Sequence, residues 1–176
     1  AFQNSYDTET SIGLEGTKSL SGRTLKDGEF TFEVKDKAGK VVATGSNKSD
    51  GSISFNNKLN YKLSDLEKAD GSYESEKTYE YTVNEVIPEG ATAENNYTVN
   101  GVTYDSKTVN VKVTVTYNKE TGELKAELAK DSEAIAFQNS YDTETSIGLE
   151  GTKSLSGRTL KDGEFTFEVK DKAGKV

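Results

Sequence analysis

A long internal repeat constrains this chain more than any other feature. Residues 1–41, from AFQNSYDTET through DKAGKV, recur without a change as residues 136–176. The period, 136 minus 1 or 135 residues, is far longer than a solenoid unit and matches the length of one whole domain. We therefore expect a complete domain followed by the opening of another, taken from a tandem array of near-identical domains.

The boundaries of the repeat follow from a short polar segment, YDTETS at residues 6–11, which we interpret as the linker between repeats. Residues 1–9 are then expected to hold the last strand of a preceding repeat plus the linker. Residues 10–142 are expected to form the complete domain, and residues 143–176 the first strands of the next, incomplete repeat. An array of this kind gives length to a molecule and is not a catalytic device.

The charge and hydropathy of the chain exclude some classes of binding partner. Charged residues make up 30% of the chain and the net charge is −8, with no basic cluster. A nucleic acid or an anionic membrane surface would need Lys and Arg to neutralise phosphates, so neither is expected as a partner. No apolar run is long enough to span a bilayer, so membrane insertion is not expected within this sequence.

Four residue types are absent: Cys, His, Met and Trp. Without Cys or His there is no disulfide, no thiolate or imidazole metal site and no His-based triad. The segment NKSDG at residues 47–51 lacks the alternating acidic ligands of a calcium loop and is interpreted as a turn. We therefore expect no cofactor, no metal and no enzyme acting on a substrate.

Hydrophobic alternation with a period of two residues predicts an all-β fold. The longest run, Val109 to Tyr117, has an apolar residue at every second position, and Asp-Gly turns at residues 50–51 and 70–71 separate shorter runs. A short helical turn is expected near residues 64–68. Seven or more short strands of this kind predict an immunoglobulin-like β-sandwich.

Three polar residues occupy apolar faces of the predicted strands. Residues two apart in a strand share a face. By this rule Lys18 lies in phase with leucines of the first strand, Glu85 with apolar residues of a middle strand, and Asn139 with apolar residues of the last strand. All three are therefore expected to point inward.

This set of residues can react with itself. Burial removes the proton of an amine and adds one to a carboxyl group, which leaves a neutral nucleophile beside a neutral acid. We expect the Lys18 amine to attack the Asn139 side-chain carbonyl carbon while Glu85 polarises the carbonyl oxygen and transfers protons, and ammonia leaves. The alternative is a buried, unreacted Lys18–Glu85 ion pair with Asn139 hydrogen-bonded nearby.

Several stretches resemble the FctA-like pilin isopeptide-linkage domains of Gram-positive surface proteins. They are GTKSLSGRTLKDGEFTFEV around Lys18, DGSISF at residues 50–55, YEYTVNEV around Glu85, GVTYD at residues 101–105 and AFQNSY around Asn139. The resemblance implies a CnaB-type sandwich with a Lys18–Asn139 isopeptide bond catalysed by Glu85. Lys153 and Asn4 repeat Lys18 and Asn139, but neither has the rest of its domain, so neither is expected to be cross-linked in this chain. No sortase motif or pilin-motif lysine is found.

The expected function is an extracellular structural stalk or fibre repeat of a bacterial cell surface or pilus. Its expected partners are the neighbouring identical repeats of the same chain, with strand exchange or fibre assembly through the incomplete terminal repeats as a further route. The alternative is an adhesin module whose loops bind a host protein or glycan, to which exposed Tyr97 and Tyr104 would contribute.

Overall fold

The computed structural model describes residues 6–176. The chain divides into two compact units, one ending at Thr143 and the other spanning Glu144–Val176. Within the described range, no helix has both the length and the apolar character needed to cross a membrane.

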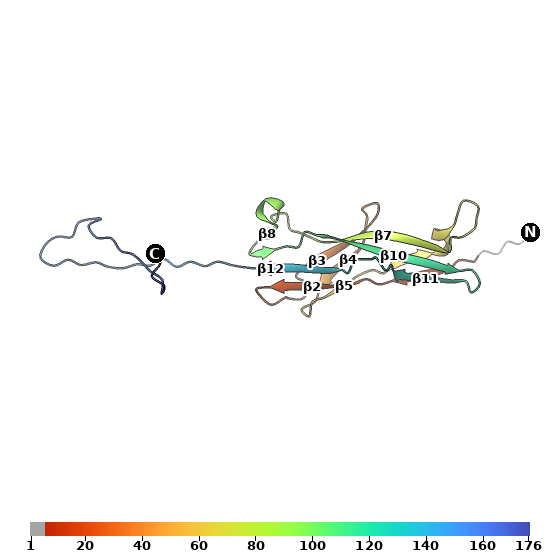
Figure 1. The fold of residues 1–176 in the computed structure, drawn as a ribbon, viewed down its shortest axis with the longest axis horizontal. Coiled ribbons are helices and arrows are strands. Elements are labelled where there is room, and N and C mark those ends of the chain that lie inside the picture. The colour runs from red at the N-terminus through yellow and green to blue at the C-terminus, as the bar shows by residue number, and fades with distance from the viewer. Residues whose placement is uncertain (1–5) are drawn as a thin grey trace, which may run out of the picture. The chain divides into compact units, whose positions relative to one another are not determined.

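The first unit is built almost entirely from strands (Figure 1). These are β1 (Glu9–Ile12), β2 (Glu15–Ser21), β3 (Thr31–Asp36), β4 (Val41–Asn47), β5 (Ser52–Phe55), β6 (Leu59–Lys62), β7 (Glu76–Glu85), β8 (Thr98–Val99), β9 (Val102–Thr103), β10 (Thr108–Asn118), β11 (Glu123–Leu128) and β12 (Ala136–Tyr141). Two short 3-10 helices, η1 (Leu63–Leu66) and η2 (Ala93–Asn95), complete it. The all-β prediction is therefore confirmed.

Ten strands form one continuous ladder in the order β11-β10-β7-β3-β4-β5-β2-β12-β9-β8, and β1 pairs with β6 in a small second sheet. The ladder folds over so that β2 and β12 face β3 and β7. Two contacts establish this: the Lys18 amine reaches Glu85 of β7, and the rings of Phe32 and Phe137 lie 5.1 Å apart. Strand β2 and the last strand, β12, thus lie side by side in one layer.

Alternating apolar residues supply the core between the layers, because every second side chain of a strand points the same way. Along β10, Val109, Val111, Val113 and Val115 are all buried. They pack with Phe32, Val34 and Val83 of the neighbouring strands into a single hydrophobic cluster.

The structure corrects the sequence pattern in three places. The first strand is two strands, since β1 pairs with β6 and β2 pairs with β5 and β12. The alternation of Leu59, Tyr61 and Leu63 predicts a single strand, but Leu63 is buried in η1 and not in a strand. Leu128, in phase with buried Leu124, is 52% exposed at the end of edge strand β11. The alternation of apolar residues does not show where a strand ends or where it is interrupted.

The second unit, Glu144–Val176, contains turns and bends but no helix or strand along its whole described length. These residues repeat the sequence of β1, β2 and β3, and they were expected to open a further repeat. In the first unit, those strands pair with β6, β5, β12, β4 and β7, of which all but β12 lie wholly or largely beyond the repeated sequence. Within residues 6–176, no residue of Glu144–Val176 is assigned to a strand pairing.

Candidate functional site

Lys18 lies in the middle of β2 with its amine inside the sandwich. Only 3% of the residue is exposed, and its Nζ lies 4.6 Å from the ring centre of Phe30 and 5.9 Å from that of Phe32. Strand alternation places it on the core face, between Gly16 and Leu20. A lysine amine enclosed by aromatic rings has lost most of its hydration and needs a polar partner.

Asn139 is held next to Lys18 by the pairing of β2 with β12. The two strands run parallel, and Lys18 is opposite Phe137 while Asn139 is opposite Leu20. Lys18 and Asn139 are therefore diagonal neighbours on the same face of adjacent strands. Asn139 is 4% exposed, so its carboxamide also lies in the core.

Glu85, the last residue of β7, reaches the pair from the opposite layer. Its Oε2 accepts a hydrogen bond from Lys18 Nζ at 2.8 Å, and its Oε1 accepts one from Asn139 Nδ2 at 2.7 Å. Glu85 is 5% exposed. One carboxyl group thus bridges the amine and the amide, and all three side chains that the strand pattern placed inward meet at one point.

Burial shifts both ionisable groups of the site toward neutrality. Desolvation lowers the pKa of Lys18, against the opposing hydrogen bond and charge of Glu85. Desolvation likewise raises the pKa of Glu85, and the contacts with Lys18 and Asn139 only partly oppose it. Both directions favour an uncharged amine beside a protonated carboxyl group, because an apolar enclosure penalises charge.

The contacts of Glu85 differ in one respect from those expected. Glu85 was expected to polarise the carbonyl oxygen of Asn139, but it contacts the amide nitrogen instead. The carbonyl oxygen, Oδ1, accepts a hydrogen bond from the backbone N–H of Asp105 at 2.9 Å. Asp105 lies in the segment between β9 and β10. Sequence reasoning did not find this donor, because any residue except proline carries a backbone N–H.

The arrangement provides each component of an aminolysis. An amine is the nucleophile, a carboxamide is the acyl donor, a carboxyl group contacts both nitrogen atoms, and an N–H group contacts the carbonyl oxygen. Groups fixed in this way react far faster than the same groups free in water. The same contacts also satisfy the hydrogen-bonding needs of the alternative, an unreacted buried ion pair.

Lys153 and Asn4 are the repeats of Lys18 and Asn139. Lys153 is exposed, and its Nζ lies 4.9 Å from the ring centre of Phe165. Asn4 lies outside the described residues. Among residues 6–176, the structure assembles one such site, from Lys18, Glu85 and Asn139.

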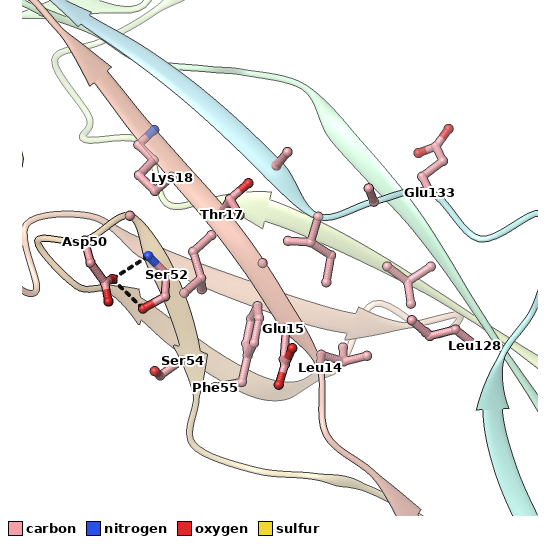
Figure 2. A pocket seen from close by; sticks show the side chains of 17 residues that line it. Leu14, Glu15, Thr17, Lys18, Asp50, Ser52, Ser54, Phe55, Leu128 and Glu133 are labelled. Carbon is pink, nitrogen blue, oxygen red and sulfur yellow. Dashed lines mark hydrogen bonds between the residues drawn. The ribbon is translucent and has the colours of Figure 1, made fainter.

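A hollow beside β2 is distinct from this site (Figure 2). Its walls include Leu14, Phe55 and Leu128. Lys18 forms part of the wall, but its amine bonds Glu85 of β7. Asp50 and Ser52, at the same hollow, bond each other, with Ser52 N and Oγ 2.8 and 2.7 Å from Asp50 Oδ1.

The two tyrosines considered for ligand binding are not exposed. Tyr97 and Tyr104 are both half-buried. The ring of Tyr104 packs edge-on against Phe30 with 5.8 Å between ring centres, as part of the wall around the core. Both residues are therefore less exposed than the adhesin alternative assumed, and Tyr104 lies at the rim of the core.

Comparison with known proteins identifies a family. The model of FctA, the Spy0128-like isopeptide containing domain, matches residues 14–142. Similar solved structures include the major pilin from Streptococcus pyogenes, at 19% identity and a TM-score of 0.41, covering 76% of this chain and 51% of that one. Another is the T-13 major pilin protein of the same organism, at 19% identity and a TM-score of 0.35, covering 77% and 54%. The chain thus spans about half the length of these pilins. No curated protein matches the chain.

Proposed function

The chain belongs to the family of Spy0128-like isopeptide containing domains, and we propose that it is a structural repeat of a Gram-positive surface fibre, locked by a Lys18–Asn139 isopeptide bond. The observation that carries the proposal is the carboxyl group of Glu85, buried between the Lys18 amine and the Asn139 amide at 2.8 and 2.7 Å. A buried carboxyl group that contacts both nitrogen atoms suits the transfer of a proton from one to the other.

The proposed reaction balances without any added reagent. The neutral Lys18 amine attacks the side-chain carbonyl carbon of Asn139, and a new bond forms between that carbon and Nζ. Nζ loses one proton to Glu85 Oε2, and Glu85 gives one proton from Oε1 to Nδ2. The bond from the carbon to Nδ2 then breaks and ammonia leaves, so the carboxyl group ends as it began.

The bond would stabilise the domain in two ways. Lys18 and Asn139 are 139 − 18 = 121 residues apart, and closing a loop of that length stabilises by roughly 4–5 kcal/mol in the chain-entropy model. Tension in an array enters near β2 and leaves through β12, and these strands lie side by side. A covalent bond between them would carry the load and keep the enclosed residues folded.

The proposal places the repeat outside the cell, in a stalk that holds another part of the molecule away from the surface. Its partners are other copies of the same repeat, as the recurrence of residues 1–41 indicates. Glu85 acts once per chain and regenerates no free site, so the repeat is not an enzyme in the ordinary sense.

The intact mass of the full chain under denaturing conditions tests the bond. We expect a mass about 17 Da below that calculated from the sequence, the mass of one ammonia. Lys18→Ala, Glu85→Gln and Asn139→Ala should each have the full mass. Lys153→Ala is the matched control, since it removes the same residue from the second copy and should keep the lighter mass. A wild-type chain at full mass would contradict the proposal and leave a buried ion pair.

Single-molecule pulling tests the mechanical role. The cross-linked chain should show no extension step from the loop between the two residues. Lys18→Ala should release about 120 residues, a reach of roughly 400 Å at about 3.3–3.6 Å per residue. Equal extension of both chains would show that the bond does not carry the load.

A further inference from the structure

We propose that Asp105 completes the reaction centre: its backbone N–H is the oxyanion donor for the Asn139 carbonyl oxygen, and its side-chain carboxylate positions that donor. The inference rests on the proposed cross-link and assigns a group that the Lys–Glu–Asn set leaves out. As the amine adds to the carbonyl carbon, negative charge develops on Oδ1, and a fixed N–H directed at that atom stabilises the transition state.

The geometry of the donor supports this role. Asp105 N lies 2.9 Å from Asn139 Oδ1, within the range expected of an oxyanion donor. The Glu85 carboxyl group hydrogen-bonds to Lys18 Nζ and Asn139 Nδ2, whereas Asn139 Oδ1 bonds to the Asp105 N–H. Proton transfer and charge stabilisation are therefore assigned to two different groups, which approach the amide from two different segments of the chain.

The Asp105 carboxylate fastens its own backbone to β12. Its Oδ2 accepts the backbone N–H of Gln138, the residue before Asn139, at 2.9 Å. Its Oδ1 accepts the backbone N–H of Lys107 at 3.3 Å, and the Lys107 amine lies 3.2 Å from Oδ2. The segment that carries the donor is thus tied directly to the strand that carries the acceptor, one residue away.

The ionisation of Asp105 is consistent with this fastening. Burial alone would raise its pKa, but the hydrogen bonds from Gln138 and Lys107 outweigh burial and bring the pKa below its ordinary value. The side chain, 16% exposed, therefore remains a charged acceptor at neutral pH because its pKa is lowered. Two backbone donors and one ammonium group hold it in place.

The test is the rate of cross-linking in the full chain. The chain is made by cell-free synthesis, samples are quenched in denaturant over time, and the fraction that has lost about 17 Da is measured. Asp105→Ala keeps the N–H but releases it from β12, so we expect the rate to fall between about 10-fold and 100-fold. Asp105→Asn has one carbonyl oxygen for two backbone donors and should give an intermediate rate.

A matched control separates this effect from a general loss of structure. Asp70 holds a turn with the same chemistry, its Oδ1 accepting Ser72 N at 2.9 Å and Ser72 Oγ at 2.6 Å, and it has no recorded contact with the site. Asp70→Ala should cross-link at the wild-type rate. The Tm of each Asp105 variant is also measured with Lys18→Met, which cannot cross-link, so that stability is read without the bond.

Each outcome decides the inference. If Asp105→Ala does not fold, Asp105→Asn with an unchanged Tm must still react more slowly than the wild type. Cross-linking of folded Asp105→Ala or Asp105→Asn at the wild-type rate would overturn the role of Asp105 and leave the Lys18–Asn139 bond intact. A wild-type chain with no loss of mass would instead contradict the proposed function itself, so the two failures are distinguishable.

Discussion

Two identical stretches of this chain have different structures. Residues 9–36 contain β1, β2 and β3, whereas residues 144–171, with the same sequence, contain no strand. Their local contacts are nevertheless alike. The Lys35–Glu33 ion pair of 3.0 Å recurs as Lys170–Glu168 at 3.1 Å.

Turns recur in the same way as ion pairs. The Gly39 N–H donates a hydrogen bond to the Asp36 carbonyl at 2.9 Å, and the Gly174 N–H donates the equivalent bond to the Asp171 carbonyl, also at 2.9 Å. Contacts between residues a few positions apart are therefore set by the sequence of the segment itself. Strand formation and burial of the lysine depend on partners far along the chain, because a strand pairs its backbone groups with another strand.

The largest expected difference between the copies is resistance to proteolysis. Lys35 is in a central strand, paired on both sides by β4 and β7, and trypsin must open the domain to reach it. Its copy Lys170 is exposed and does not lie in a strand. We expect cleavage after Lys170 to be about 1,000-fold faster or more, since domain opening costs several kcal/mol. Mass spectrometry of timed digests measures both rates.

Adding the sequence of residues 42–142 after Val176 should remove this difference, because the second copy would then have its strand partners. If Lys170 were cleaved as fast in the longer chain as in this one, the dependence on distant partners would be wrong.

A glycine pair gives the next largest effect. Gly22 and Gly157 have the same left-handed backbone, with φ of 88° and 89°. A Cβ on Gly22 would lie 1.9 Å from the backbone oxygen of Tyr141 in β12, whereas a Cβ on Gly157 would meet nothing within 4 Å. Gly22→Ala should therefore cost about 3 kcal/mol or more in free energy of unfolding, from the clash and the unfavourable φ.

Gly157→Ala should leave the unfolding of the first unit within about 0.5 kcal/mol of the wild type. Urea unfolding of both variants measures the contrast. Equal losses in the two variants would show that the close approach of Gly22 to β12 has no energetic consequence.

Asn47 should have a smaller effect. Its buried side chain accepts the Phe30 N–H at 2.8 Å and donates to the Lys26 carbonyl at 2.7 Å, which fastens the loop before β3 to the end of β4. Asn47→Ala should lower the free energy of unfolding by about 1–3 kcal/mol, because it leaves a buried N–H without its partner. Asn57→Ala, at an exposed contact of 3.5 Å, should change it by less than about 0.5 kcal/mol.

The pH dependence of a chain that cannot cross-link isolates the titration of one buried group, Glu85. Burial raises the folded-state pKa of Glu85 above its usual 4.5. Lys18→Met removes the hydrogen bond and charge that oppose this shift. A raised folded pKa contributes stability that is present below pH 4.5 and is lost as the pH rises through the folded value.

Urea unfolding at a series of pH values measures this loss. Lys18→Met should become less stable as the pH rises from about 4.5 toward neutrality. In the Lys18→Met, Glu85→Gln double variant this part of the pH dependence should be absent. The same slope in both variants would mean that Glu85 is not buried as described.

Sequence patterns predicted the features that repeat along a strand. The alternation of valines predicted β10. The spacing of Lys18, Glu85 and Asn139 from neighbouring apolar residues predicted that all three point inward. The two-residue strands β8 and β9 are too short to show a period. The burial of Asn47 was missed because its segment resembles an ordinary polar turn, and its partners are backbone atoms.

The Asp105 donor could not be predicted for a related reason. Its function depends on a backbone group placed by tertiary structure, and side-chain chemistry does not indicate it. The resemblance of GVTYD to a known family gave a signal at this position, but it did not distinguish a structural role from a chemical one.

Peptide mapping of the wild-type chain after trypsin digestion tests the central claim most directly. We expect a branched peptide in which residues 1–23 are joined through Lys18 to Asn139 of residues 131–153, about 17 Da lighter than the sum of the two peptides. Its second branch should end at Lys153, cleaved because that copy of the lysine is free. Separate, unmodified peptides around Lys18 and Asn139, or a linkage through Lys153, would contradict the account.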